Sequence, residues 1–316
     1  MKSISKFNVE GVEVTRGILG CDSFISWLYE GGGSLFKGSD GKIDSSKTLE
    51  VMKTSVECGV RSLDVSPPLV EVFNRLRKQS DERIEGLGAI QEWRCANFMI
   101  DSVPLSKHAE EIKATMCSTL PPNFLEHSKV AIPSYVRSFF LHENSLKPLT
   151  VSQIERITMN SEFFEKKLEF YQRLDLKIVL YGGGAADWLV ALGRSDLLEN
   201  LTRLIRRHGF IPILVCHWAS LVLPRAEKEL DAAGYVIPLN RLWSIQSLAD
   251  VLRVTKKIRK PIIAMKPLAR GALANDLEGA FEFLFKKAGV TAVLVGVSSV
   301  AEAKQTFQVL QMVCTR

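Results

Sequence analysis

Short runs of apolar and β-branched residues recur along the whole chain and alternate with segments of helical periodicity. Most of these runs are nearly continuous in apolar residues, which is typical of parallel strands that are buried on both faces. In the segment Asp196–His208, by contrast, leucine and isoleucine recur every three or four residues, as on one face of a helix. We predict strands at Val14–Gly20, Val60–Val65, Ile84–Gln91, Tyr135–His142, Lys177–Tyr181, Ile211–Cys216, Pro261–Lys266 and Ala292–Val297.

This alternation of strands and helices favours a closed (β/α)8 TIM barrel, an α/β fold, over an open sheet. An open nucleotide-binding sheet usually carries G-x-G-x-x-G after its first strand, whereas this chain has GCDSF there. We therefore expect a single barrel domain over residues 1–316.

Two long connections, 92–134 and 217–260, are expected to hold extra helices or short strands, and the apolar segment GYVIPLNRLWSI lies in the second. The Gly- and Ser-rich segment 31–46 follows the first predicted strand. We interpret it either as a plain surface loop or as a lid.

The charge and cysteine patterns narrow the possible partners. Lysine and arginine number 41 against 35 aspartates and glutamates, and the basic residues are scattered, which argues against a nucleic-acid-binding surface. No apolar stretch reaches the roughly 18 residues of a membrane span.

The six cysteines form no C-x-x-C pair and no HExxH spacing is present, so metal sites are not expected. The N-terminal residues do not resemble a signal peptide, and we expect a cytoplasmic protein.

Polar residues follow nearly every predicted strand at its C-terminal end, where TIM barrels place their active sites. The opposite ends carry mostly Gly, Lys and Arg. We therefore predict a polar pocket at the C-terminal mouth of the barrel. The candidates for its walls, apart from the residues discussed next, are Asp22, Gln91, Tyr181, His217 and Trp218.

Three strand-end residues are candidates for catalysis. Asp64 could act as a general base or orienting carboxylate, although a carboxylate there could equally cap a loop or pair with a cation. His142 could donate a hydrogen bond or move a proton near neutral pH, or it could lie in the core. Lys266 could form a Schiff base, bind an anion or carbonyl, or make an ion pair with a nearby aspartate.

The loops after the last two predicted strands point to an anionic ligand. Ser298 or Ser299 can cap the following helix, and free N–H groups at a helix start suit a phosphate. Arg270 and Gly271 lie in the preceding loop, KPLARGAL, and barrels of this type usually bind phosphate in these two loops. A capped helix has the same sequence without any ligand, so the pattern is shared with purely structural turns. We predict a small-molecule ligand that is anionic or phosphorylated.

Four patches of the chain resemble the aldo/keto reductase superfamily, namely SLDVSPP, FFLHEN, PIIAMKPLARGAL and AVLVGVSSVAEAKQTF. The PLN and KPLA patches also resemble archaeal relatives of that family. The resemblance implies a (β/α)8 barrel that reduces carbonyls with NADPH. It assigns Asp64 and His142 to the family's catalytic set, and the loops Lys266–Leu273 and Gly296–Lys304 to binding of the dinucleotide. Lys304 is the nearest cation to the family's cofactor clamp.

Two of the family's four catalytic positions are not matched in this chain. The family's tyrosine, the proton donor, should come five residues after the aspartate, where this chain has Leu69. The family's lysine should end the third strand, where this chain has Ile90 and Gln91. His142 or Lys266 could substitute as the donor.

The sequence therefore leaves three functions open. The first is a reductase that uses NADPH and a non-standard proton donor. The second is a lyase or aldolase that uses Lys266 on a phosphorylated or keto substrate. The third is a barrel that binds a ligand without catalysis.

Overall fold

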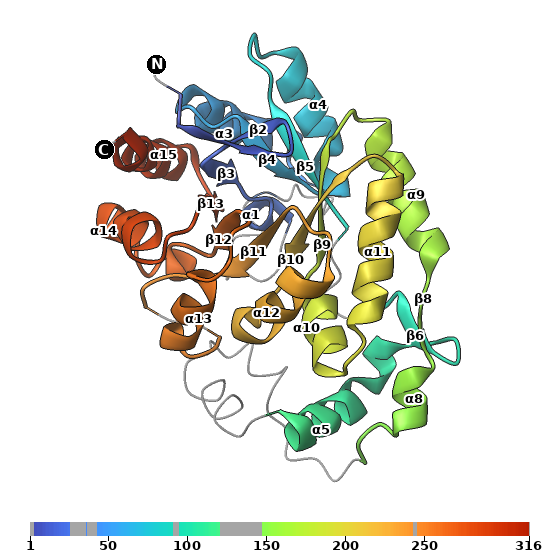
Figure 1. Cartoon of the computed structure of the whole chain (residues 1–316). Helices are drawn as coiled ribbons and strands as arrows, with labels where there is room; N and C mark the ends of the chain where they lie inside the picture. Colours follow the sequence, from blue (N-terminus) through green and yellow to red (C-terminus); the bar gives the residue numbers. More distant parts are fainter. Residues whose placement is uncertain are drawn as a thin grey trace.

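The computed structural model describes residues 3–25, 36, 43–90, 95–120, 147–242 and 245–315. Within these residues, parallel strands close into an eight-stranded barrel in the order β3, β4, β5, β9, β10, β11, β12 and β13 (Figure 1). In that order the strands span Gly17–Leu19, Ser62–Val65, Glu85–Ala89, Ile178–Gly182, Ile211–Val215, Gly234–Pro238, Ile262–Met265 and Ala292–Val295. The predicted (β/α)8 barrel is confirmed.

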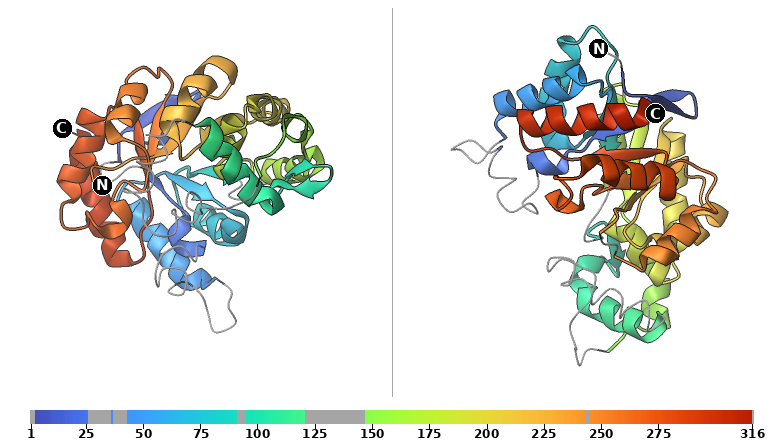
Figure 2. Two further views of the ribbon diagram at one scale, coloured as in Figure 1. Left: turned by 90° about the horizontal axis from the view of Figure 1, so that it is seen from below. Right: turned by 90° about the vertical axis from the view of Figure 1, so that its left-hand side faces the viewer.

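Helices surround this barrel, as the end-on view in Figure 2 shows. Their apolar faces are buried against the strands, and α11 (Ser195–Arg207) buries the leucine and isoleucine positions that the sequence pattern indicated. The others are α1 (Asp22–Ile25), α3 (Ser45–Glu57), α4 (Val70–Lys78), α9 (Ser161–Gln172), α10 (Gly184–Ala191), α12 (Ala219–Glu229), α13 (Leu248–Thr255), α14 (Leu277–Glu282) and α15 (Val300–Thr315).

The hairpin of β1 (Lys6–Val9) and β2 (Val12–Thr15) closes the N-terminal end of the barrel. Val9 and Val14 of this hairpin belong to the same buried cluster as Ile18, Leu87 and Ile178 inside the barrel. The hairpin therefore seals one end of the barrel with apolar side chains and leaves the C-terminal mouth as the end where polar groups can gather.

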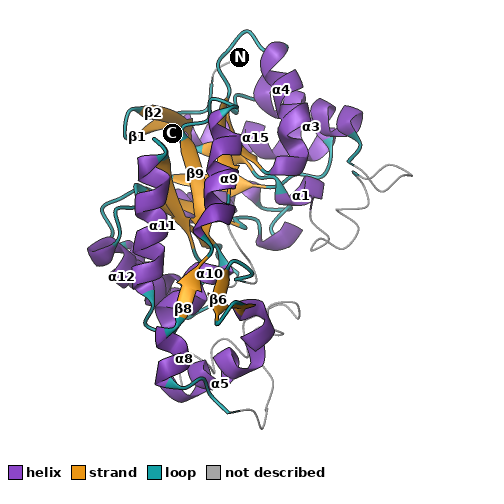
Figure 3. Ribbon diagram, turned by 90° about the vertical axis from the view of Figure 1, so that its right-hand side faces the viewer, coloured by secondary structure: helices purple, strands orange, loops and turns teal. Residues whose placement is uncertain are grey.

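A smaller group of elements extends from the connection between β5 and β9. It contains β6 (Phe98–Ile100), β7 (Val103–Pro104), β8 (Ile157–Met159), α5 (Ala109–Thr119) and α8 (Val151–Glu155), and the three strands pair antiparallel. Figures 1 and 3 show this group on the side of the barrel where α10 follows β9. The extra elements expected in the first long connection are confirmed.

The position of two barrel strands differs from the prediction. The run Tyr135–His142 lies outside the described residues, and β5 pairs directly with β9, with Leu87 opposite Ile178. The prediction that Tyr135–His142 fills the fourth position is therefore wrong. The missing strand is β11, which we interpreted as decoration in the second long connection.

The sequence pattern did not indicate β11 as a barrel strand, because turn-forming residues stand at both of its ends. Gly234 is required there, since a Cβ at this position would lie 2.9 Å from the Pro261 carbonyl oxygen on the neighbouring chain segment. Pro238 closes the strand with no N–H group to donate. Only the three residues between them, Tyr235–Ile237, carry the β-branched and aromatic signal of a strand.

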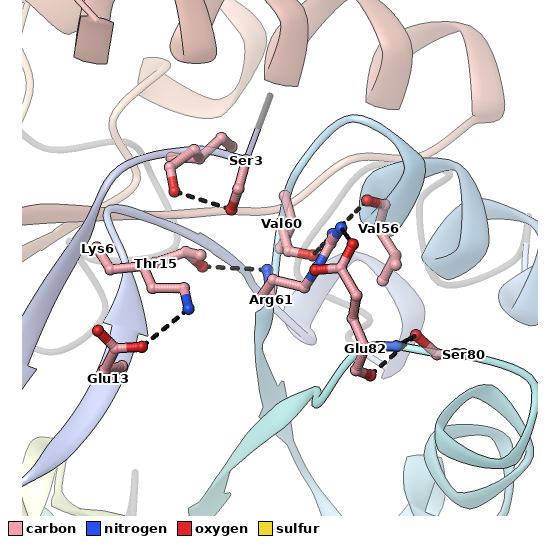
Figure 4. Close-up of polar contacts among 10 residues, drawn as sticks. Ser3, Lys6, Glu13, Thr15, Val56, Val60, Arg61, Ser80 and Glu82 are labelled. Carbon is pink, nitrogen blue, oxygen red and sulfur yellow. Dashed lines mark hydrogen bonds and ion pairs between the residues drawn. The ribbon is translucent and has the colours of Figure 1, made fainter. Parts of the chain in front are cut away.

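Arg61 forms hydrogen bonds that connect several chain segments at the N-terminal end of the barrel (Figure 4). Its guanidinium donates to both carboxylate oxygens of Glu82 and to the carbonyl oxygens of Val56 and Val60. Its backbone N–H donates to Thr15 Oγ1 at 3.2 Å. One side chain thus joins the end of α3, the start of β4 and the segment before β5.

We expect Arg61→Ala to lower the free energy of unfolding by about 2 kcal/mol, because it removes the hydrogen bonds that the partly buried guanidinium donates to Glu82 and to the Val56 and Val60 carbonyl oxygens. The matched control is Lys6→Ala, which removes the exposed Lys6–Glu13 ion pair of the hairpin and should cost less than about 1 kcal/mol. Urea unfolding at pH 7 measures both variants. Equal losses for the two variants would contradict the role given to Arg61.

Candidate active site

A cavity opens at the C-terminal ends of the barrel strands, where the sequence predicts the pocket. Its base is the apolar inner layer of the barrel, including Leu180, Val215, Val236 and Leu294. Its walls come from β4, from the segment after β3, from the loop after β12 and from the start of α15. Six of the predicted site residues line it, namely Asp22, Asp64, Lys266, Arg270, Gly271 and Ser298.

Asp64 is the most buried acidic group of this cavity, with only 5% of the residue exposed. Its Oδ2 accepts a hydrogen bond from the Cys21 thiol at 2.9 Å, whereas Oδ1 has no hydrogen-bond partner among the described residues. Burial raises the pKa of Asp64 to about 7, the Cys21 hydrogen bond opposes the rise, and the Asp22 carboxylate adds to it. A carboxyl that keeps its proton near neutral pH can act as an acid.

Cys21 is a residue whose role the sequence analysis missed. Its sulfur lies 3.1 Å from Ser66 Oγ as well as next to Asp64. Burial, then the charges of Asp64 and Asp22, raise the pKa of this thiol well above its usual value. Cys21 is therefore a protonated donor that holds one oxygen of Asp64. Its position directly after the first strand, beside the second, is the signal that could have revealed the pair.

Tyr171 supports β4 and β5 from outside the barrel. Its hydroxyl lies 3.1 Å from the carbonyl oxygen of Val65 and 2.9 Å from that of Ala89, and it accepts a hydrogen bond from the Ala89 N–H. Its ring packs over Gly88, where a Cβ would lie 2.9 Å from the ring. The contact of the Tyr171 hydroxyl with Val65 fixes the end of β4 directly after Asp64.

Lys266 begins a loop with unusual backbone geometry. Lys266, Ala269 and Arg270 have φ angles of 56°, 50° and 61°, a region that non-glycine residues seldom adopt. The side chain of Asn240 holds the turn by donating to the Lys266 carbonyl oxygen at 3.2 Å. Such strain persists only where surrounding contacts impose it, and it is common at functional sites.

The groups around Lys266 shift the pKa of its ammonium group in opposite directions. Its side chain is half-buried, and desolvation of the ammonium group lowers its pKa. Arg270 lowers this pKa further, whereas Asp22 raises it. Asp22 also influences Asp64, so its carboxylate stands close enough to affect both groups that could handle a proton in the cavity.

At the start of α15, the hydrogen-bond donors of Ser298, which an anion could use, are already occupied by a side chain of the protein. The Glu302 carboxylate accepts hydrogen bonds from the backbone N–H and the hydroxyl of Ser298, each at 2.7 Å. Ser299 Oγ in turn accepts from the Glu302 N–H at 3.1 Å. Lys304 does not line the cavity, where Gln305 and Thr306 of the same helix do.

Three predicted wall residues lie elsewhere. Tyr181 is buried, and its hydroxyl lies 2.6 Å from Thr202 Oγ1 on α11, so its ring faces the surrounding helices. His217 Nδ1 lies 2.9 Å from the buried carboxylate of Asp187, which also accepts from the His217 and Trp218 backbone N–H groups. This interaction fixes the turn after β10. None of Tyr181, His217 and Trp218 lines the cavity.

Other predictions fall partly or wholly outside the described residues. Gln91 and His142 lie there, as does the segment 31–46 except for Phe36 and residues 43–46. Leu69, at the position of the family's tyrosine, is fully buried in the core. Among the described residues there is no cluster of three metal-ligating side chains and no helix with the length and apolarity to cross a membrane.

The pKa of Asp64 predicts how stability changes with pH. In the folded chain this pKa is about 7, whereas an unfolded aspartate titrates near about 4. The folded state therefore binds more protons between these values, and its stability falls as pH rises through this range. Asp64→Asn removes this penalty, so the variant should gain stability relative to wild type between about pH 4 and pH 7, by up to about 4 kcal/mol.

Urea unfolding at several pH values measures this difference. Asp81→Asn, at an exposed position, serves as the matched control for the loss of one carboxylate. A difference between wild type and Asp64→Asn that stays constant with pH would show that Asp64 is not perturbed.

Comparison with known proteins shows the fold. No family model and no curated protein sequence matches the chain. Among solved structures, an aldo-keto reductase from Bacillus halodurans in its holo form matches with a TM-score of 0.57 and 12% identity, covering 97% of this chain and 90% of that one. A Pseudomonas aeruginosa protein assigned to the aldo-keto reductases matches with a TM-score of 0.56 and 14% identity, covering 98% and 94%. The chain therefore has the barrel fold of the aldo-keto reductases.

Proposed function

We propose that this chain is an oxidoreductase of the aldo-keto reductase type, which reduces a small carbonyl compound with a nicotinamide dinucleotide. The observation that carries the proposal is the buried Asp64 carboxyl, with one oxygen held by Cys21 and the other without a partner among the described residues at the cavity. The fold and the position of the cavity support it. The proposal includes a cytoplasmic location, in keeping with cysteines that form no disulfide in the described chain.

The described residues fit a dinucleotide in two respects. Gly271 and Gly296 line the cavity without side chains, which allows a ligand to approach the backbone closely. Arg270 brings a guanidinium to the cavity wall, where it suits a pyrophosphate. When bound, the reduced nicotinamide supplies the hydride.

Asp64 serves as the proton donor in this proposal. As negative charge develops on the carbonyl oxygen, the neutral Asp64 carboxyl gives its proton to that oxygen, and the alcohol forms. The Asp64 carboxylate that remains keeps the hydrogen bond from Cys21 and regains a proton from water. The Lys266 ammonium stabilises the developing negative charge. Leu69, fully buried and apolar, cannot supply the proton that the family's tyrosine supplies.

We expect Asp64→Asn to lower kcat for carbonyl reduction by at least about 100-fold while the affinity for the dinucleotide changes little. In the wild type, kcat should fall as pH rises above about 7, because the acid form of Asp64 is lost. The measurement is oxidation of NADH and NADPH in the presence of an aldehyde and ketone panel. Tyr181→Phe, which removes a hydroxyl outside the cavity, is the matched control. Full activity of Asp64→Asn would rule out the proposed donor.

The lowered pKa of Lys266 favours a second candidate, in which its amine attacks a keto substrate to form a Schiff base. Borohydride treatment with a panel of keto acids and sugar phosphates, followed by mass spectrometry, separates the two functions. If the chain is a reductase, we expect no adduct on Lys266. An adduct that is absent from Lys266→Arg would instead establish the lyase or aldolase chemistry.

A further inference from the structure

Three buried polar side chains form a row that ends at the cavity. Asp64 belongs to β4, Ser66 follows that strand directly, and Cys21 follows the neighbouring strand β3. Ser66 still has an extended backbone, so the side chains of Asp64 and Ser66 lie on the same face of the strand. The Cys21 sulfur therefore reaches both of them, at 2.9 Å from Asp64 Oδ2 and 3.1 Å from Ser66 Oγ.

The number of hydrogens in this row fixes the direction of its hydrogen bonds. A thiol carries one hydrogen, and an ionised carboxylate can only accept. The thiol hydrogen therefore points to Asp64 Oδ2, and the hydroxyl of Ser66 donates to the sulfur. Both bonds run in one direction, from Ser66 through Cys21 to Asp64, so that each strengthens the next.

Protonation of Asp64 at its other oxygen leaves this row unchanged. Oδ1 has no hydrogen-bond partner among the described residues, and Asp64 lines the cavity. A proton on Oδ2 would have to donate to sulfur, which is a weak acceptor, and the thiol hydrogen would have to turn away from the carboxyl. A proton on Oδ1 needs no such rearrangement and is available to a ligand oxygen in the cavity.

We propose that Cys21 is a positioning residue for carbonyl reduction, and that together with Ser66 it keeps the transferable proton of Asp64 on Oδ1. This inference rests on the proposed function and adds to it the atom from which the proton leaves. As the carbonyl carbon gains the hydride, the Oδ1–H bond breaks and its proton passes to the carbonyl oxygen. The electron pair of that bond stays on Asp64, whose Oδ2 keeps the hydrogen bond from the thiol. Cys21 itself forms no covalent bond, because a buried and protonated thiol is a poor nucleophile.

The contribution of the thiol to Asp64 can be measured separately from that of the other charged groups. Burial raises the pKa of Asp64, the hydrogen bond from Cys21 lowers it, and the charge of Asp22 raises it. The other ionisable groups that line the cavity within the described residues, or that interact electrostatically with Asp64, are Tyr171, Lys266, Arg270 and Glu302. All of these groups stay in place in a Cys21 variant.

The test compares Cys21→Ala, which removes the donor, with Cys21→Ser, which keeps a donor at the same position. Cys216→Ala is the matched control, because Cys216 is also a buried cysteine directly after a barrel strand and does not line the cavity. Carbon-13 NMR of the aspartate carboxyl carbons measures the titration of Asp64, with Asp64→Asn to assign the signal. The dependence of kcat on pH is measured with the aldehyde and ketone panel and both dinucleotides, and thermal unfolding checks that each variant folds.

We expect Cys21→Ala to raise the midpoint of the Asp64 titration by about one pH unit, because the ionised form loses a hydrogen bond. At low pH, where Asp64 is protonated in every variant, kcat of Cys21→Ala should fall about tenfold because the proton is no longer held on Oδ1. Cys21→Ser should restore kcat to within about threefold of the wild type, and the control should match the wild type in both measurements.

Infrared spectroscopy of the wild type tests the direction of the row without substrate or dinucleotide. The S–H stretching band of Cys21, assigned by its loss in Cys21→Ser, should move to lower frequency as Asp64 ionises, because a carboxylate accepts more strongly than a neutral carboxyl. A band that does not move, or an unchanged midpoint or unchanged low-pH kcat in Cys21→Ala, overturns the inference and leaves the reductase proposal intact. If the wild type reduces no carbonyl compound of the panel, the proposed function itself fails, and this inference fails with it.

Discussion

Closure of the parallel sheet is the constraint on which the rest of the molecule depends. Each barrel strand is only three to five residues long, too short to be stable without hydrogen bonds to neighbours on both sides. The direct pairing of β5 with β9 closes the ring and leaves no open edge. Because all barrel strands are parallel, their C-terminal ends meet at one mouth. The residues that follow the strands are then brought together although they are far apart in the sequence.

Desolvation at this mouth gives Asp64 its chemical character. The apolar barrel layer below it penalises the charged carboxylate, and the neighbouring Asp22 adds to the penalty. The Cys21 thiol compensates only in part, because it is a weak donor. The resulting near-neutral pKa destabilises the folded chain at neutral pH, a cost that proteins commonly bear at functional sites. The strained loop at Lys266 lies at the same cavity and is a second such cost.

The sequence predicted much of the fold but not all of the strand order. Continuous apolar runs located most barrel strands, because buried parallel strands need apolar residues on both faces. The same rule favoured Tyr135–His142, whose composition fits a strand, over Gly234–Pro238, whose ends resemble turns. Apolar composition identifies segments that can be buried, but strand pairing decides which of them enters the sheet. That choice depends on contacts such as the close approach of Gly234 to Pro261.

The sequence predicted where the candidate site lies, but only some of the residues that line it. Strand-end positions correctly brought Asp64, Lys266 and Ser298 to one cavity, because barrel geometry orders the strand ends. The position of Tyr181 was misleading, because side chains alternate between the two faces of a strand and this ring faces α11. The occupation of the Ser298 donors by Glu302 could not be read from spacing alone, since a capped helix and an anion site have the same sequence pattern.

By itself, the sequence determined that the chain folds as an α/β barrel with polar residues at the strand ends, because hydrophobic periodicity and strand count are local properties. The tertiary structure decided which of those residues share a cavity, which oxygen of Asp64 is held by Cys21, and which charge stands at the start of α15. These features depend on side-chain direction and desolvation, which exist only once strands distant in sequence have closed into the barrel.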